Sequence, residues 1–203
     1  RLFSAAPYDA CGLTDFDLRY FAILRHAVGN PAVGTLTTAN PSTVLLLCRK
    51  ILAWGDELAD AIAIGQFGRS LADAQVVPAW DREAVLAVLG KGLEPNRGRA
   101  AEVRRAVSEG PDGLLSRLWP QLTTVNCWLG GHAPVYLARL RPFLGDIPVR
   151  DPGFSASEGL FAIPLRSGTA EGVLHNSGPF MEFVPEHEVA DRTLLSHELD
   201  VGV

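Results

Sequence analysis

Apolar side chains recur at helical spacing in several stretches of this 203-residue chain, and each stretch predicts a helix. The predicted helices span residues 14–28, 42–54, 56–64, 81–89, 99–109 and 133–144. Asn40 and Pro41 suit the N-cap and first position of the second helix, and Asp81 suits the N-cap of the fourth. The helix over 42–54 is apolar nearly all round, so we expect it to be buried. The helix over 99–109 is charged, so we expect it on the surface.

Short runs of β-branched, aromatic and other apolar residues predict strands between these helices. The runs span residues 33–37, 123–128, 147–149, 159–164, 173–175 and 180–184. Because strands and helices alternate, we predict the α/β class, with a mixed sheet flanked by helices. The length fits a single, partial α/β domain over residues 1–203. Within it, residues 66–113 are expected to form a helical, surface-exposed, insertion-like region without catalytic residues.

Two of the predicted strands are followed by loops with candidate functional residues. Leu129-Gly130-Gly131-His132 follows the strand over 123–128, and Phe154-Ser155-Ala156-Ser157-Glu158 follows the strand over 147–149. Glycine lets a backbone approach a ligand closely, and open α/β sheets bind ligands beyond the carboxyl ends of their strands. We therefore expect one ligand site formed by both loops.

Composition narrows the class of protein and its surroundings. Hydrophobic residues make up 47% and charged residues 20%, and the net charge of −5 argues against a nucleic-acid partner. No apolar run reaches the roughly 18 residues of a membrane span. The cysteines, Cys11, Cys48 and Cys127, are scattered in apolar surroundings, which is typical of reduced core residues. We expect a cytoplasmic protein.

The two loops carry a resemblance to a known family. Gly130-Gly131-His132-Ala133-Pro134 opens a predicted helix, and the segment 154–158 follows at the spacing found in acyl-adenylate-forming enzymes. The chain is most similar to the acyl-acid amido synthetases, the family of the plant auxin- and jasmonate-conjugating enzymes and their bacterial relatives. Segments that support this resemblance are 40–43, 118–122, 127–128 and 178–185. It implies a central fragment from the large N-terminal domain of an adenylate-forming enzyme.

The resemblance implies ATP and Mg²⁺ as cofactors and assigns residues to them. An aromatic ring gives adenine a flat apolar surface, a hydroxyl can bind phosphate, and a carboxylate supplies a hard oxygen to magnesium. Phe154 would stack on adenine, and Ser155 would lie beside it. Ser157 would bind phosphate and Glu158 would bind the metal, so both are the candidate catalytic residues. Phe154 stands where many relatives have tyrosine, which leaves only stacking at that position.

The glycine loop is implied to face both the nucleotide and the acyl substrate. Backbone groups of Gly130 and Gly131 would contact the ligands, and Trp128 would form a wall of the acyl pocket. His132, at the start of a helix, would make a polar contact with substrate. For Trp128 the alternative is a plain core residue. For His132 it is a capping or solvent-facing side chain.

Other interpretations of segment 154–158 remain open. Ser155 or Ser157 could cap a turn with Glu158 as its partner. Ser155-Ala156-Ser157-Glu158-Gly159 also approaches the G-x-S-x-G nucleophile elbow of a serine esterase of the α/β-hydrolase class, with Asp191 and His197 following. A non-catalytic nucleotide-binding or interaction domain with the same scaffold is a further alternative.

Other elements of the family pattern have no match in this chain. The resemblance implies an upstream Ser/Thr/Gly-rich phosphate loop, a later Arg-Val-Gly-Asp-like segment and a C-terminal catalytic lysine. Neither Lys50 nor Lys91 lies in a matching place. We therefore expect the parent protein to be the ligase, joining a small carboxylic acid to an amine, expected to be an amino acid. The fragment alone is expected to be inactive, and unpaired strand edges near Phe161 and Phe183 make oligomerisation possible.

Overall fold

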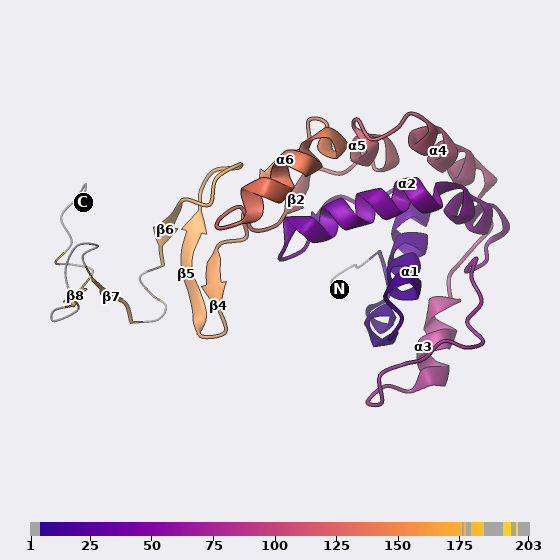
Figure 1. Ribbon diagram of the computed structural model, residues 1–203, viewed down its shortest axis with the longest axis horizontal. Coiled ribbons are helices and arrows are strands. Elements are labelled where there is room, and N and C mark those ends of the chain that lie inside the picture. Colours follow the sequence, from indigo (N-terminus) through magenta and orange to yellow (C-terminus); the bar gives the residue numbers. More distant parts are fainter. Residues whose placement is uncertain (1–4, 176, 178–179, 185–192, 196–197, 199–203) are drawn as a thin grey trace.

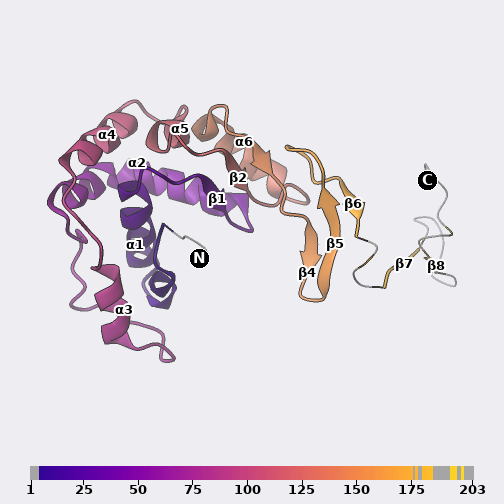
Figure 2. The same ribbon diagram turned by 180° about the vertical axis from the view of Figure 1, so that it is seen from behind.

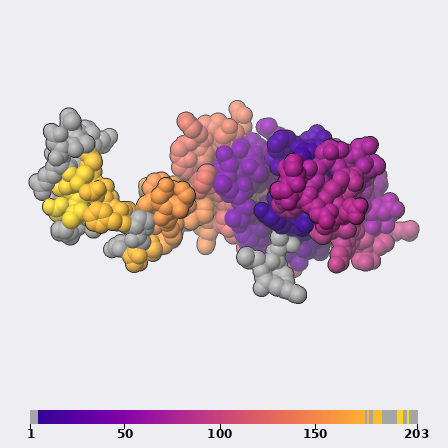
Figure 3. All heavy atoms as spheres, turned by 90° about the horizontal axis from the view of Figure 1, so that it is seen from below, coloured from indigo at the N-terminus to yellow at the C-terminus, as the bar shows by residue number. Residues whose placement is uncertain are grey.

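The computed structural model describes residues 5–175, 177, 180–184, 193–195 and 198, and shows a helical body with a small parallel sheet (Figure 1). An antiparallel sheet stands beside this body, and Figure 3 shows it as a narrower orange lobe. The α/β class, with helices flanking the sheet, is confirmed. Parallel and antiparallel strands are divided between separate small sheets.

Except for the helix over 56–64, the predicted helices begin within two residues of the predicted positions, and side chains cap several of them; η1 and α5 were not predicted. The helices are η1 (Tyr8–Gly12), α1 (Phe16–Gly29), α2 (Pro41–Ile64), α3 (Arg82–Leu89), α4 (Arg97–Ser108), α5 (Leu114–Leu118) and α6 (Ala133–Leu144). The side chains of Asn40 and Asp81 accept hydrogen bonds from backbone N–H groups of α2 and α3, which confirms both predicted caps. The first helix is capped by Asp15, so it begins after the predicted Thr14.

In the described residues the strands form three small sheets. β1 (Thr35–Thr37), β2 (Thr124–Asn126) and β3 (Val149–Arg150) are parallel, in that order. β4 (Phe154–Ala156), β5 (Gly159–Pro164) and β6 (Gly172–Leu174) form an antiparallel meander, and β7 (Glu182–Phe183) pairs with β8 (Leu194–Leu195). The strand over 159–164 is confirmed to the residue, whereas the strand over 180–184 is shorter than predicted.

The predicted break between two helices at Gly55 is wrong, because residues 41–64 form one helix of 24 residues. Gly55 is buried where α2 meets α4, and a Cβ built on it would lie 2.7 and 2.8 Å from the two methyl carbons of Val107. The glycine thus serves close helix packing instead of ending a helix. In the described part of the chain, no helix has both the length and the apolarity needed to cross a membrane.

The helix expected on the surface, over 99–109, has a buried inner face. Ala100, Val103 and Ala106 of α4 are buried, and so is Arg99, whose exposed fraction is 4%. α4 packs along α2 over the top of the body in Figure 1. The expectation of a surface helix is therefore right only for its outer, charged face. The insertion-like character of residues 66–113 stays a prediction.

Arg99 joins the ends of two helices inside the body. Its Nε donates to the carbonyl of Val28 near the end of α1 at 2.9 Å, and its Nη2 donates to the carbonyl of Leu118 at the end of α5 at 2.6 Å. Its remaining nitrogen pairs with Glu102 at 2.9 Å. Carbonyls at a helix C-terminus lack intrahelical partners, so this one side chain satisfies two of them.

The cysteines are free, and two of the three fit the core prediction. Cys48 and Cys127 are buried, whereas Cys11 is exposed, which corrects the expectation for that residue. Burial raises the pKa of Cys48 to about 12. Burial, followed by the charge of Asp151, raises the pKa of Cys127 to about 11. Both buried thiols therefore stay protonated at neutral pH and behave as small apolar groups.

We expect Gly55→Ala to lower the free energy of unfolding by about 1 kcal/mol. Overpacking costs about 1–3 kcal/mol, whereas replacing glycine within a helix gains only about 1 kcal/mol. No rotation of Val107 relieves the contact, because both methyl groups and Cβ lie within 3.1 Å of the added carbon. Gly98→Ala on α4 is the control, since its nearest neighbour would be 3.6 Å away. Urea denaturation measures both; a more stable Gly55→Ala variant would contradict this packing argument.

We expect Arg99→Met to lower the free energy of unfolding by about 2–4 kcal/mol, because it leaves two buried carbonyls without donors. Arg97→Met, on the exposed side of the same helix, should change it by less than about 0.5 kcal/mol. Equal losses in the two variants would show that the buried hydrogen bonds of Arg99 add nothing to stability.

Candidate functional site

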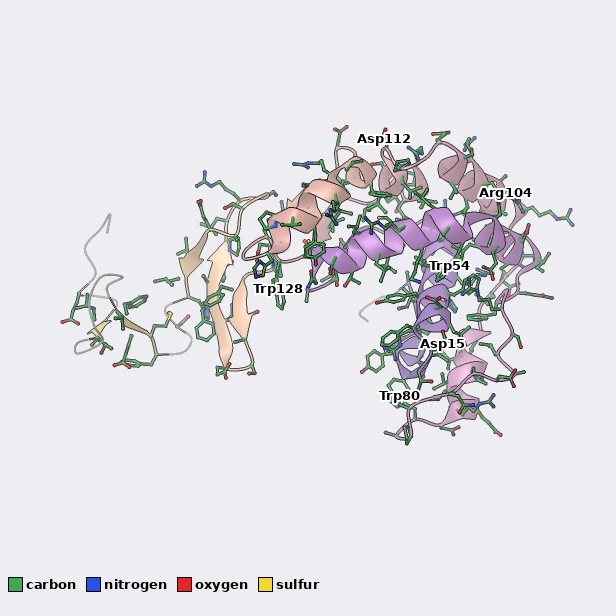
Figure 4. All side chains as sticks on the ribbon, in the orientation of Figure 1. Asp15, Trp54, Trp80, Arg104, Asp112 and Trp128 are labelled. Atoms are coloured by element: carbon green, nitrogen blue, oxygen red, sulfur yellow. The ribbon has the colours of Figure 1, made fainter. Side chains whose placement is uncertain are left out.

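The candidate site lies at the carboxyl ends of β2 and β3. These strands are parallel and paired, with Val125 opposite Val149 and Asn126 opposite Arg150, so the loops that follow them leave the same edge of the sheet. Figure 4 shows Trp128 at this edge, where the helical body meets the antiparallel sheet. Ligands bind at this position in open α/β sheets.

A cavity of about 460 Å³ opens between the two loops. The structure brings together five of the predicted site residues in its lining: Trp128, Gly130, Gly131, Phe154 and Ser155. Asp151, Gly153 and Ala170 complete the lining. An adjoining cavity of about 570 Å³ lies under α6 and is mostly apolar, with Arg141 and Ser167 at its polar positions and Leu129 in its wall.

The glycine loop is a turn that leads directly into α6. The N–H of Ala133 donates to the carbonyl of Gly130 at 3.2 Å, and Gly131 has a φ of 60°, which favours glycine. A Cβ on Gly130 would lie 3.7 Å from the Cβ of Ala170, so the loop runs close to the segment before β6. His132 stands at the N-cap of α6, exposed and without a side-chain capping bond, and it is not part of the cavity lining.

The aromatic residues at the cavity are open to solvent. Trp128 has an exposed fraction of 46%, so within the described chain it is not the core residue of the alternative interpretation. Phe154 has an exposed fraction of 68%, and its ring lies 5.5 Å from that of Phe161 on β5, centroid to centroid. Exposed apolar side chains around a cavity are typical of a ligand site.

Ser157 and Glu158 lie away from the cavity lining. The loop predicted over 154–158 is wrong: residues 154–156 form β4, and Ser157 and Glu158 form the turn to β5. At roughly 3.3 Å per strand residue, this turn begins about 10 Å along β4 from Phe154. Figure 2 shows it at the end of the hairpin that points away from α6. The Ser157 hydroxyl donates to Glu158 Oε2 at 3.1 Å, and both residues are exposed.

The serine-esterase alternative fails on local structure. A nucleophile elbow places its serine on a sharp turn from a strand to a helix, whereas Ser157 lies in a turn between antiparallel strands. The proposed partners Asp191 and His197 lie outside the described residues.

Asp151 is one of three lining residues that the sequence interpretation missed, together with Gly153 and Ala170. Its carboxylate accepts hydrogen bonds from the N–H groups of Leu129 at 2.7 Å and Gly153 at 2.8 Å, and it lines the cavity. The available signal was an acidic residue at the carboxyl end of a predicted strand, two positions beyond Val149. Ala170 was missed as well, because only the fold brings the segment before β6 next to the glycine loop.

The fold and the site together define an α/β domain with a cavity at the carboxyl ends of parallel strands, beside a glycine turn that opens a helix. Residues 1–149 match the family described as "GH3 family N-terminal domain". The chain belongs to the GH3 family. The predicted resemblance to the acyl-acid amido synthetases is confirmed.

Three relatives place the chain within that family. It is 29% identical over 188 residues to a human GH3 domain-containing protein, covering 89% of this chain and 31% of the relative. It is 33% identical over 150 residues to a probable indole-3-acetic acid-amido synthetase GH3.9 of Oryza sativa subsp. japonica. This match covers 71% of this chain and 32% of the relative. It is 30% identical over 170 residues to the jasmonoyl–L-amino acid synthetase GH3.3 of the same rice subspecies. This match covers 81% of this chain and 35% of the relative.

Solved structures share the fold. A GH3.15 acyl acid amido synthetase superimposes with a TM-score of 0.72 at 18% identity, over 89% of this chain and 32% of the other. AtGH3.15 acyl acid amido synthetase in complex with 2,4-DB superimposes with a TM-score of 0.71 at 18% sequence identity, over 93% of this chain and 32% of the other. The chain thus spans about a third of the length of the proteins it matches.

We expect Trp128→Ala to lower the free energy of unfolding by only about 1–2 kcal/mol, because nearly half of this side chain is already exposed. Trp119→Ala is the matched comparison: that indole is 2% exposed, and its removal should cost about 3–5 kcal/mol. Chemical denaturation of both variants, followed by circular dichroism, makes the comparison. If Trp128→Ala lost as much unfolding free energy as Trp119→Ala, Trp128 would be a core residue, as in the alternative interpretation.

Proposed function

We propose that the polypeptide carrying this chain is an ATP-dependent ligase that adenylates a small carboxylic acid and transfers the acyl group to an amino acid. The observation that carries the proposal is the cavity joining the Gly130–Gly131 loop to Phe154 in a chain of the GH3 family. The rice relatives named as amido synthetases for indole-3-acetic acid and as a jasmonoyl–amino acid synthetase support the reaction class.

The nucleotide would bind along β4. The exposed ring of Phe154, backed by Phe161, offers the flat apolar surface that adenine needs. Ser155 lies next to it, and the backbone of Gly130 and Gly131 forms the facing wall. A nucleotide that starts at Phe154 and follows the strand would direct its phosphates toward the turn at Ser157.

The turn between β4 and β5 has the donor chemistry for phosphate and magnesium. Glu158 is exposed, and its carboxylate accepts a hydrogen bond from the Ser157 hydroxyl at 3.1 Å. Magnesium in nucleotide sites is usually held by one or two carboxylates together with phosphates, so a single exposed carboxylate fits this role. The ion would neutralise phosphate charge there, and Ser157 would hydrogen-bond a phosphate oxygen.

The acyl acid would occupy the part of the cavity beside Trp128, with His132 near its entrance. Its carboxylate oxygen, directed toward the turn at Ser157, would attack the α-phosphorus of ATP, and pyrophosphate would leave. The chain's contribution is to hold the two reactants in line, since orientation alone supplies a large part of such rate enhancements. In the second step the amine nitrogen would attack the acyl carbonyl carbon, AMP would leave, and the nitrogen would lose a proton to give the amide.

A non-catalytic nucleotide-binding domain is the second candidate. The human and mouse relatives, which align with 89% and 86% of this chain, are named only as GH3 domain-containing proteins. Both candidates bind ATP, and only the ligase exchanges pyrophosphate into it. Measuring binding and exchange on the same preparation separates them.

We expect Glu158→Ala, in the complete polypeptide, to reduce ATP–pyrophosphate exchange on the order of a hundredfold or more, because metal-held phosphate charge is worth several kcal/mol in the transition state. Glu83→Ala on α3 is the control, since that carboxylate is exposed and belongs to the other end of the body (Figure 1). Near-normal ATP–pyrophosphate exchange in Glu158→Ala would contradict the proposed role of Glu158 in holding magnesium.

A further inference from the structure

Asp151 occupies the junction between the two loops of the site. It is the first residue after β3 and is half-buried. One carboxylate oxygen accepts the N–H of Leu129 at 2.7 Å, and the other accepts the N–H of Gly153 at 2.8 Å. Hydrogen bonds to an ionised acceptor are shorter and about twice as strong as neutral ones. One side chain therefore binds two backbone segments that lie far apart in the sequence.

The entry to the glycine loop is fixed at each residue. The N–H of Cys127 donates to the carbonyl of Arg150 at 3.0 Å, and the N–H of Trp128 donates to the carbonyl of Ala39 at 3.0 Å. The N–H of Leu129 follows, and among these three bonds it alone uses a side chain as acceptor. The bond to Asp151 is therefore the last fixed point before Gly130 and Gly131.

The second bond fixes the start of β4. Gly153 is buried with a φ of 115°, and a Cβ on it would lie 2.8 Å from the carbonyl oxygen of Ala162 on β5. Its backbone therefore runs directly against β5 in a conformation suited to glycine. Phe154 is the next residue, so the position of Gly153 sets the position of its ring.

We propose that Asp151 is a positioning residue that holds the glycine loop and the start of β4 at a fixed separation, and so sets the shape of the cavity between Trp128 and Phe154. The proposal builds on the adenylation function above, in which these walls hold the acyl acid and the nucleotide. Asp151 also fixes the backbone of Leu129, whose side chain forms part of the wall of the cavity under α6.

The chemistry of the carboxylate favours positioning over a direct role. Each of its oxygens accepts a hydrogen bond from a backbone donor, and in the described part of the chain no ion pair includes Asp151. An asparagine has nearly the same shape but offers only one acceptor oxygen. Its NH₂ group would face a backbone N–H, and two donors repel, so Asp151→Asn breaks one of the two bonds.

The test measures backbone protection and ligand affinity in the same variants. Hydrogen exchange followed by NMR compares Asp151→Asn with Asp146→Asn, an exposed acid in the turn before β3. We expect exchange of the Leu129 or Gly153 amide to accelerate at least tenfold in Asp151→Asn only. The Val125 amide, which bonds to the Pro148 carbonyl, should keep its rate in both variants. In the complete polypeptide, KM should rise at least tenfold for both ATP and the acid, with a smaller fall in kcat.

Each failure has a distinct meaning. Unchanged exchange at Leu129 and Gly153 in Asp151→Asn would overturn the positioning role. Faster exchange with unchanged KM values would also overturn it, because the bonds would then serve only the fold. If the unaltered polypeptide shows no ATP–pyrophosphate exchange, the proposed function fails. In that case, isothermal titration calorimetry compares the affinity for ATP of Asp151→Asn and Asp146→Asn. Equal affinities would contradict the positioning role of Asp151.

Discussion

Carbonyl groups at helix C-termini are the constraint on which the helical body depends. They have no partners within their own helices, and burying them without donors is costly. Arg99 binds carbonyls at the ends of α1 and α5, and His26 binds the carbonyl of Leu89 at the end of α3. Arg25 binds the carbonyl of Gln66 just beyond α2 and adds a bond to that of Ala61, which also accepts a backbone N–H. Each of these donors lies on a helix other than the one whose end it binds, so the helices are joined end to side as well as face to face.

The same constraint explains why charged residues lie inside an apolar body. Burial lowers the pKa of Arg25, which nonetheless stays charged, and it lowers the pKa of His26, which keeps the ring neutral with Nε2–H facing the Leu89 carbonyl. A neutral imidazole and a guanidinium thus both donate hydrogen bonds to backbone carbonyls at or just beyond helix ends. These bonds tie α1 to the segments around the ends of α2 and α3, and α4 to the ends of α1 and α5.

Local signals in the sequence were sufficient for most of the helices and strands and for five of the eight residues that line the cavity. Asn40, Asp81 and Gly145 mark helix ends by their own chemistry, and the apolar run over 159–164 marks a strand. Contacts between distant segments were not predictable in this way. Gly55 looked like a break because its partner Val107 is on another helix, and Arg99 looked exposed because its acceptors belong to α1 and α5. Asp151 was missed for the same reason, since its function depends on a backbone N–H of residue 129.

The turn and helix between β2 and β3 form a segment of fixed length. Leu129 and Asp151 are bonded to each other, and α6, with its 12 residues, lies between them. One inserted residue would turn the rest of the helix by about 100° and lengthen it by about 1.5 Å, so Leu140 and Phe143 would leave the core. Insertions and deletions among relatives should therefore avoid 129–151 and collect in exposed turns such as 91–95. The spacing between the two loops is then itself a physical signature of the site.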